Sequence, residues 1–179
     1  IVPSGLTFNH DVTFTDCTIY CAYTDYDDIA STQWTVNGGK TVTFNHCTIM
    51  AGCPDKRWQG IKVISAPLSL NAFEEDRTKS GIINITNPNI AIIEARNYGK
   101  VICQDGTTIE DAIKAVESKD GGKIIASGSH FNNNQYDLYY NEHSRAQGNA
   151  NPPTITDCTF STTRQLNNSR IYPKAHILM

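Results

Sequence analysis

The sequence predicts an all-β protein folded as a right-handed parallel β-helix, a solenoid of about six three-strand coils. Three observations carry this prediction. A nine-residue phrase recurs along the chain, its apolar residues alternate as in strands, and one of its slots holds residue types that tolerate a left-handed backbone. The composition agrees, because Thr and Asn are abundant while the helix formers Leu, Glu and Lys are scarce.

The recurring phrase is clearest as VTFTDCTIY at Val12–Tyr20 and VTFNHCTIM at Val42–Met50. Each copy alternates apolar and polar residues, bends at one polar residue and alternates again, which predicts a strand, a kink and a second strand. Four further copies follow. They are Ile82–Ile90, Val101–Ile109, Lys123–Phe131 and Pro153–Phe160.

The slot before the cysteine position is the expected kink. In the six copies it holds Asp16, His46, Asn87, Gly106, Gly128 and Asp157. These residue types enter the left-handed region more readily than others. The following slot holds Cys17, Cys47, Pro88, Thr107, Ser129 and Cys158. Because Pro, Ser and Thr replace Cys there, the phrase marks architecture and not a metal or disulfide framework.

A third strand between consecutive copies would close each coil, and varying loops would absorb differences in coil length. The candidates are Gln33–Val36, Gly60–Val63, Tyr136–Tyr140 and Ala175–Leu178. One segment, Thr107–Ser118, has apolar spacing that also fits an amphipathic helix. Its register against Lys123–Phe131 favours strands.

The 179 residues, 39% of them hydrophobic, are enough for a single domain that spans residues 1–179. A net charge of −3 gives no basic field, so nucleic acid is not an expected partner. The chain has no run of about 18 apolar residues, so we expect no membrane insertion. Both ends read as strand sequence without caps, which favours a piece of a longer parent protein.

The six cysteines are an even number, which is compatible with disulfides in an oxidising compartment. They show neither a CxxC pair nor zinc-site spacing. One bridge, such as Cys21–Cys53, stays open. We interpret the cysteines of the repeated slot as buried thiols that act as small apolar residues.

Four phrases carry a resemblance to known proteins: RWQGIKV, TIEDAIKAV, DGGKIIASGSHFNNNQYDLYY, and DCTFSTTRQLNN followed by YPKAHI. From about Cys53 to its end, the chain resembles right-handed β-helix regions of large secreted or surface proteins of Bacteroidetes-type bacteria, within the pectin-lyase-like superfamily. The resemblance implies an extracellular or cell-surface location and a multidomain parent. It brings no assigned catalytic residues, and fold alone does not settle function.

The same superfamily includes polysaccharide lyases and glycoside hydrolases, so an enzyme is the alternative to a binding segment. Hydrolysis needs two carboxylates placed across the scissile bond. The outward lane expected on the third strands holds only scattered charges. Its residues are Thr35, Lys62, Glu117, Asp137, Tyr139 and His176. We therefore expect a non-catalytic segment that binds polysaccharide or a surface partner, or a structural spacer, and we assign no catalytic residue.

The ligand-binding candidates are Trp58, Lys62, Asp137 and Tyr139, since an exposed aromatic ring beside polar groups can stack on a sugar. Burial in the core is the competing explanation for Trp58. The acidic loop TDYDDI offers weak Ca²⁺ candidates, Asp25, Asp27 and Asp28. This loop lacks the Gly and the distal Glu of an EF-hand, so a solvated loop is the favoured interpretation. No cofactor is expected beyond this open question of Ca²⁺.

Overall fold

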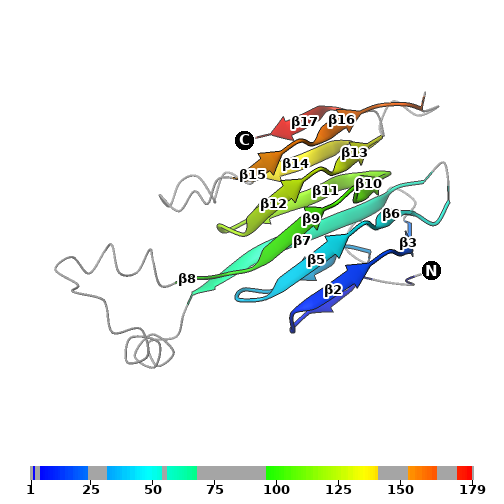
Figure 1. Cartoon of the computed structure of the whole chain (residues 1–179). Coiled ribbons are helices and arrows are strands. Elements are labelled where there is room, and N and C mark those ends of the chain that lie inside the picture. Colours follow the sequence, from blue (N-terminus) through cyan, green and yellow to red (C-terminus); the bar gives the residue numbers. More distant parts are fainter. Residues whose placement is uncertain are drawn as a thin grey trace, which may run out of the picture.

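The computed structural model describes residues 2, 5–23, 32–53, 56–67, 96–140, 153–164 and 173–178. Within these residues every regular element is a β-strand (Figure 1). The strands form three parallel sheets that run along the length of the molecule. The parallel β-helix expected from the repeat is therefore confirmed.

Each sheet takes one strand from each coil. Sheet I contains β1 (Thr7–Phe8), β4 (Trp34–Val36), β7 (Trp58–Pro67), β11 (Ala112–Lys119), β14 (Tyr136–Tyr140) and β17 (Ala175–Leu178). Sheet II contains β2 (Val12–Thr15), β5 (Thr41–Asn45), β9 (Lys100–Gln104), β12 (Lys123–Ser127) and β15 (Thr154–Thr156). Sheet III contains β3 (Thr18–Cys21), β6 (Thr48–Ala51), β10 (Thr108–Glu110), β13 (His130–Asn132) and β16 (Thr159–Ser161).

The chain visits sheets I, II and III in turn, so β1, β2 and β3 form the first coil and β14, β15 and β16 the fifth. The strand β17 begins a further coil. Equivalent slots of the phrase lie directly opposite one another, as Val12 and Val42 do in sheet II and Ile19 and Ile49 do in sheet III. All four expected third strands are present in sheet I, and the segment Thr107–Ser118 forms strands.

The kink slot has the left-handed backbone that its residue types predict. The φ angles are +50° at Asp16, +53° at His46, +81° at Gly106, +56° at Gly128 and +52° at Asp157. Hydrogen bonds between coils continue through this corner, for example from the amide of Asp16 to the Asn45 carbonyl (3.1 Å). The kink thus turns the chain from sheet II to sheet III without interrupting the ladder.

The inward rows of the three sheets form one apolar core. Aromatic rings from successive coils stack within it: Phe14 lies 5.2 Å from Phe44, and Phe131 lies 5.3 Å from Phe160. Trp34 contacts the ring of Trp58 at 5.5 Å, and both indoles are almost completely buried. Because each coil contacts mainly its neighbours, stability accumulates coil by coil.

Two further expectations concern the repeat copy at Ile82–Ile90 and a Cys21–Cys53 disulfide. The copy at Ile82–Ile90 and its kink residue Asn87 lie outside the described residues, and β5 pairs directly with β9, with Val42 opposite Val101. The copy at Val101–Ile109 is therefore the next coil after Val42–Met50.

All six cysteines are free thiols, so the disulfide between Cys21 and Cys53 that the sequence left open is not formed.

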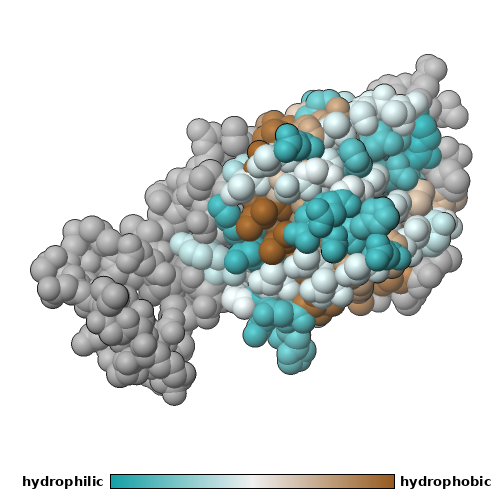
Figure 2. Space-filling model, viewed as in Figure 1, coloured by the Kyte–Doolittle hydropathy of each residue, from teal (hydrophilic) through white to brown (hydrophobic). Residues whose placement is uncertain are grey.

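The outward rows of sheets II and III are mostly polar. Sheet III presents a column that holds Thr18, Thr48, Thr108, His130 and Thr159 in consecutive coils. Figure 2 shows the corresponding face as largely hydrophilic or neutral, with small apolar areas. No helix among the described residues is long and apolar enough to cross a membrane.

Candidate ligand-binding face

Four residues of the expected outward lane lie in one row across sheet I. Thr35 is opposite Lys62, Lys62 is opposite Glu117, and Glu117 is opposite Tyr139. Each comes from a different coil, so the row runs along the stacking direction. The periodicity of the third strands was enough to find this row, because one residue in each strand faces outward at the same height.

Asp137 departs from this lane because sheet I contains a β-bulge. The register between β7 and β11 shifts between Lys114 and Val116, which makes Ala115 an extra residue, and β14 follows β11 in step. At such a bulge two consecutive residues face the same side. Asp137 and Leu138 accordingly both point inward, and Asp137 is only 1% exposed. In a regular strand Asp137 would face outward like Tyr139, which is two residues further along.

The bulge brings two further side chains to the outward row, Lys114 and Tyr136. The Lys114 ammonium lies 4.0 Å from the centroid of the Tyr139 ring, and Tyr136 meets that ring edge-on at 5.3 Å. Lys174, just before β17, lies 5.9 Å from the Tyr136 ring. We call this surface the outer strip. It comprises Gln33, Thr35, Lys62, Lys114, Glu117, Tyr136, Tyr139 and Lys174.

Glu117 is the carboxylate of the outer strip, and its oxygens are already engaged. Lys114 binds Oε1 at 2.7 Å, and the side-chain amide of Gln33 donates to Oε2 at 3.3 Å. This pairing holds Lys114 against Tyr139. The strip itself does not present the carboxylate pair that glycoside hydrolysis uses. Within the described parts of the chain, no three His, Cys, Asp or Glu side chains form a group able to hold a metal ion.

The remaining candidates lie elsewhere. Trp58 is fully buried, and its indole N–H donates to the Glu110 carbonyl at 2.9 Å, so it belongs to the core. Lys62 is half-buried and stays on the strip with Tyr139. The Ca²⁺ candidates Asp25, Asp27 and Asp28 lie outside the described residues. Sequence reasoning missed Gln33, Lys114, Tyr136 and Lys174. The adjacent apolar residues Ala115 and Val116 are the one local sign of the bulge that places Lys114 and Tyr136.

A buried polar cluster fills the corner between sheets III and I. Asp111 and Asn133 make this turn with φ angles of +60° and +56°. Asn134 accepts a hydrogen bond from the Ala112 amide at 2.8 Å, and its own amide donates to the Ile109 carbonyl and to Asp137. Arg57 donates to the backbone carbonyls of Ala112 and Asn133.

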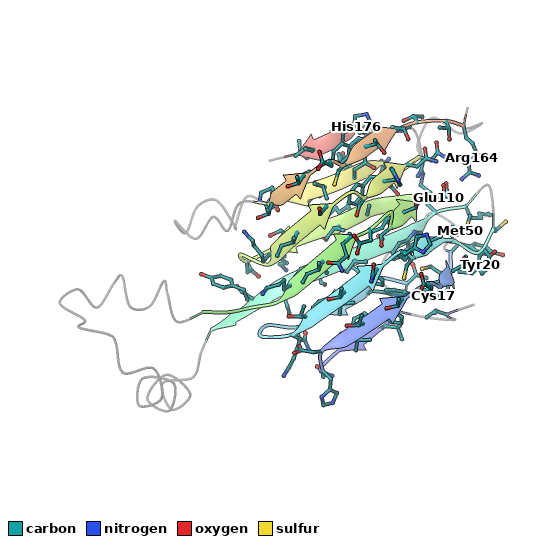
Figure 3. The ribbon with its side chains drawn as sticks, viewed as in Figure 1. Cys17, Tyr20, Met50, Glu110, Arg164 and His176 are labelled. Carbon is teal, nitrogen blue, oxygen red and sulfur yellow. The ribbon has the colours of Figure 1, made fainter. Side chains whose placement is uncertain are left out.

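Two side chains reach this cluster from the last coils. His176 lies 2.6 Å from Asp137, and Arg164 pairs with Asp111. Figure 3 shows Arg164 and His176 at the end of the solenoid formed by β16 and β17. Because Arg57 and Asn134 bind backbone groups across the corner, and Asn134 and His176 both bind Asp137, the cluster is a structural device for the corner, and Asp137 is a part of it.

Burial raises the pKa of Asp137 above the ordinary value of its carboxyl, although hydrogen bonds from Asn134 and His176 oppose the shift. Burial likewise raises the pKa of Asp111, opposed by Arg164. Both groups therefore bind a proton more tightly in the folded chain than in the unfolded chain. Their stabilising contribution is complete below about pH 3.9 and is lost as the pH rises through the folded pKa.

Replacing Asp137 with asparagine should remove this pH-dependent term. The quantity to compare is the unfolding free energy of Asp137→Asn minus that of the wild type. This difference should therefore be largest at pH 7 and should decrease as the pH falls towards 4. Urea unfolding at four pH values measures the difference, in which effects of other carboxylates cancel. If this difference increased as the pH fell, the contact with His176 would outweigh the effect of burial and would lower the pKa of Asp137.

Comparisons with known proteins add no relative. No protein-family model, no curated protein and no solved structure matches the chain.

Proposed function

We propose that this chain is a non-catalytic β-helix module that binds an extended polysaccharide along the outer strip. The observation that carries the proposal is the pair of rings Tyr136 and Tyr139 on β14, which Lys114 from β11 and Lys174 before β17 flank on the two neighbouring coils. Aromatic faces stack on the apolar faces of sugars, and neighbouring amine and amide groups hydrogen-bond their hydroxyls.

The arrangement of the strip supports a long ligand over a compact one. Its groups follow the axis of the solenoid, so consecutive units of a chain would meet equivalent positions on consecutive coils. Lys114 is held in place by Glu117 and by the Tyr139 ring, so little side-chain entropy would be lost on binding. We place this module outside the cell, at the cell surface or in a secreted parent chain, in line with the bacterial β-helix regions that the sequence resembles.

The test is affinity electrophoresis of the protein in gels that contain a panel of plant, microbial and host polysaccharides, with and without Ca²⁺. We expect retention by at least one polysaccharide. Tyr139→Ala should weaken that retention about tenfold, the effect of losing one central aromatic contact. The matched control is Tyr20→Ala, because Tyr20 is 46% exposed on sheet III, away from the strip.

Three outcomes would contradict the proposal. Equal retention of Tyr139→Ala and wild type would move the binding site off the strip. New reducing or unsaturated ends above a mock-purified control would show a hydrolase or a lyase. An absence of both retention and cleavage across the panel would favour a structural spacer.

A further inference from the structure

Two thiols of the repeated cysteine slot lie in contact at the corner between sheets II and III. The Sγ atoms of Cys17 and Cys47 are 3.5 Å apart, although the residues are 30 positions apart in sequence. They belong to the first and second coils, whose strands are paired in register on both sides, with Thr15 opposite Asn45 and Thr18 opposite Thr48.

This placement fits the geometry of a disulfide. Neighbouring strands hold their backbones about 4.8 Å apart, which falls within the Cα separation of about 4.4–6.8 Å found across disulfides. The sulfur atoms need to approach by about 1.5 Å to reach the S–S bond length. No other copy of the phrase places two cysteines in this slot on adjacent coils, since Thr107 and Ser129 separate Cys47 from Cys158.

A hollow of about 300 Å³ provides access to the pair. Its lining is Asp16, Cys17, Thr18, His46, Cys47, Thr48 and Gly106. Cys17 is half-buried whereas Cys47 is almost fully buried, so a reagent that enters the hollow meets Cys17 first. Figure 3 shows Cys17 at the first coil, beside the N-terminal end of the stack.

We propose that Cys17 and Cys47 are a site of oxidative modification, at which a small disulfide such as oxidised glutathione converts the two thiols into a bond between the first two coils. The Cys17 thiolate attacks a sulfur of the glutathione disulfide, forms a mixed disulfide and releases one glutathione thiolate. The Cys47 thiolate then attacks Sγ of Cys17 and releases the second. The protein loses two electrons and two protons, and two molecules of reduced glutathione carry them away.

The bond would fasten the first coil to the second. The first coil has neighbours on one side only among the described strands, and its core residues Val12, Phe14 and Ile19 are only half-buried. A coil whose apolar residues are only half-buried opens at low free energy. A bond across 30 residues restricts the unfolded chain, and it should lower the unfolding equilibrium constant by about two orders of magnitude or more.

The test begins with fully reduced wild-type protein, incubated with oxidised glutathione at pH 8.5 under native conditions. After acid quenching, the mass of the protein should be lower by two hydrogens than the mass of the reduced protein. After alkylation, we expect four alkylated cysteines and one cross-linked peptide that joins Cys17 to Cys47. The thiolate is the reacting form, and burial raises the pKa of the Cys17 thiol. The reaction rate should therefore increase with pH as the fraction of thiolate grows. The oxidised protein should melt at a higher temperature than the reduced protein.

Variants separate this pair from the other thiols. Cys47→Ser should stop at the mixed disulfide on Cys17 and show no gain in melting temperature. Cys158→Ser, which changes the same slot in the fifth coil, should form the bond as the wild type does. The proposal is overturned if six alkylated cysteines remain after oxidation, if the wild type stops at the mixed disulfide, or if the cross-link joins another pair such as Cys47 and Cys103 or Cys21 and Cys53.

Discussion

Replacing Gly60 with alanine should cost more than about 3 kcal/mol of folding free energy and leave little folded protein at 37 °C. Gly60 has a φ of +92°, and a Cβ at this position would lie 1.5 Å from the Lys114 carbonyl oxygen. The clashing atom is backbone, so the backbones of β7 and β11, the central strands of sheet I, must shift relative to each other. Urea unfolding followed by far-UV circular dichroism measures the loss.

Gly128 provides the matched control for this variant. It also has a positive φ, +56°, but nothing lies within 4 Å of the place where its Cβ would stand. Gly128→Ala should therefore pay only the left-handed backbone cost of about 1 kcal/mol. Gly128→Asn should cost less still, since Asp and His occupy the same slot in other coils. If Gly60→Ala and Gly128→Ala lost equal folding free energy, backbone strain, and not the contact with Lys114, would account for the effect at Gly60.

Trp58→Ala is the second large effect that we expect, at about 3–5 kcal/mol. The substitution removes a fully buried indole, its contact with Trp34 and its hydrogen bond to the Glu110 carbonyl. The melting temperature should fall by about 6–20 °C, at about 2–4 °C for each kcal/mol in a chain of this size. Scanning calorimetry measures the fall directly.

A less drastic variant separates the role of Trp58 in the core from a role in binding. Trp58→Phe keeps most of the apolar volume and loses the hydrogen bond, so it should cost about 1–2 kcal/mol. Its polysaccharide retention should equal that of the wild type under conditions where both are folded. Selective loss of retention in Trp58→Phe would mean that the indole contacts the ligand and that its burial is relieved on binding.

Much of the fold follows from local chemistry that the sequence displays. The residues Asp16, His46 and Asp157 mark a left-handed corner by type alone, and the alternating Val and Phe residues before them mark the strands. The apolar alternation of Ile82–Ile90 does not fix its place in the repeat. Any apolar alternation matches a template of period two, and only pairing in space shows that Val101 follows Val42.

The candidate site could be predicted in part, for a related reason. Strand periodicity placed Lys62 and Tyr139 in one row, because a regular strand repeats its outward side every two residues. Asp137 could not be placed in this way. Its inward direction depends on an extra residue, Ala115, in the neighbouring strand, and on partners such as His176 that come from another coil. Neither dependence is visible within the segment Tyr136–Tyr140.

The long strand β7 has a consequence for the engineering of this protein. Its far end pairs antiparallel with β8 (Arg96–Tyr98), with Ser65 opposite Tyr98 and Pro67 opposite Arg96. Pro67 and Arg96 thus lie side by side, on a two-stranded stem whose position the coils determine. The free energy of closing a loop on such a stem grows only with the logarithm of its length. We therefore expect that peptides of very different length can be inserted between Pro67 and Arg96. This stem is a suitable insertion site for displaying foreign sequences on the β-helix.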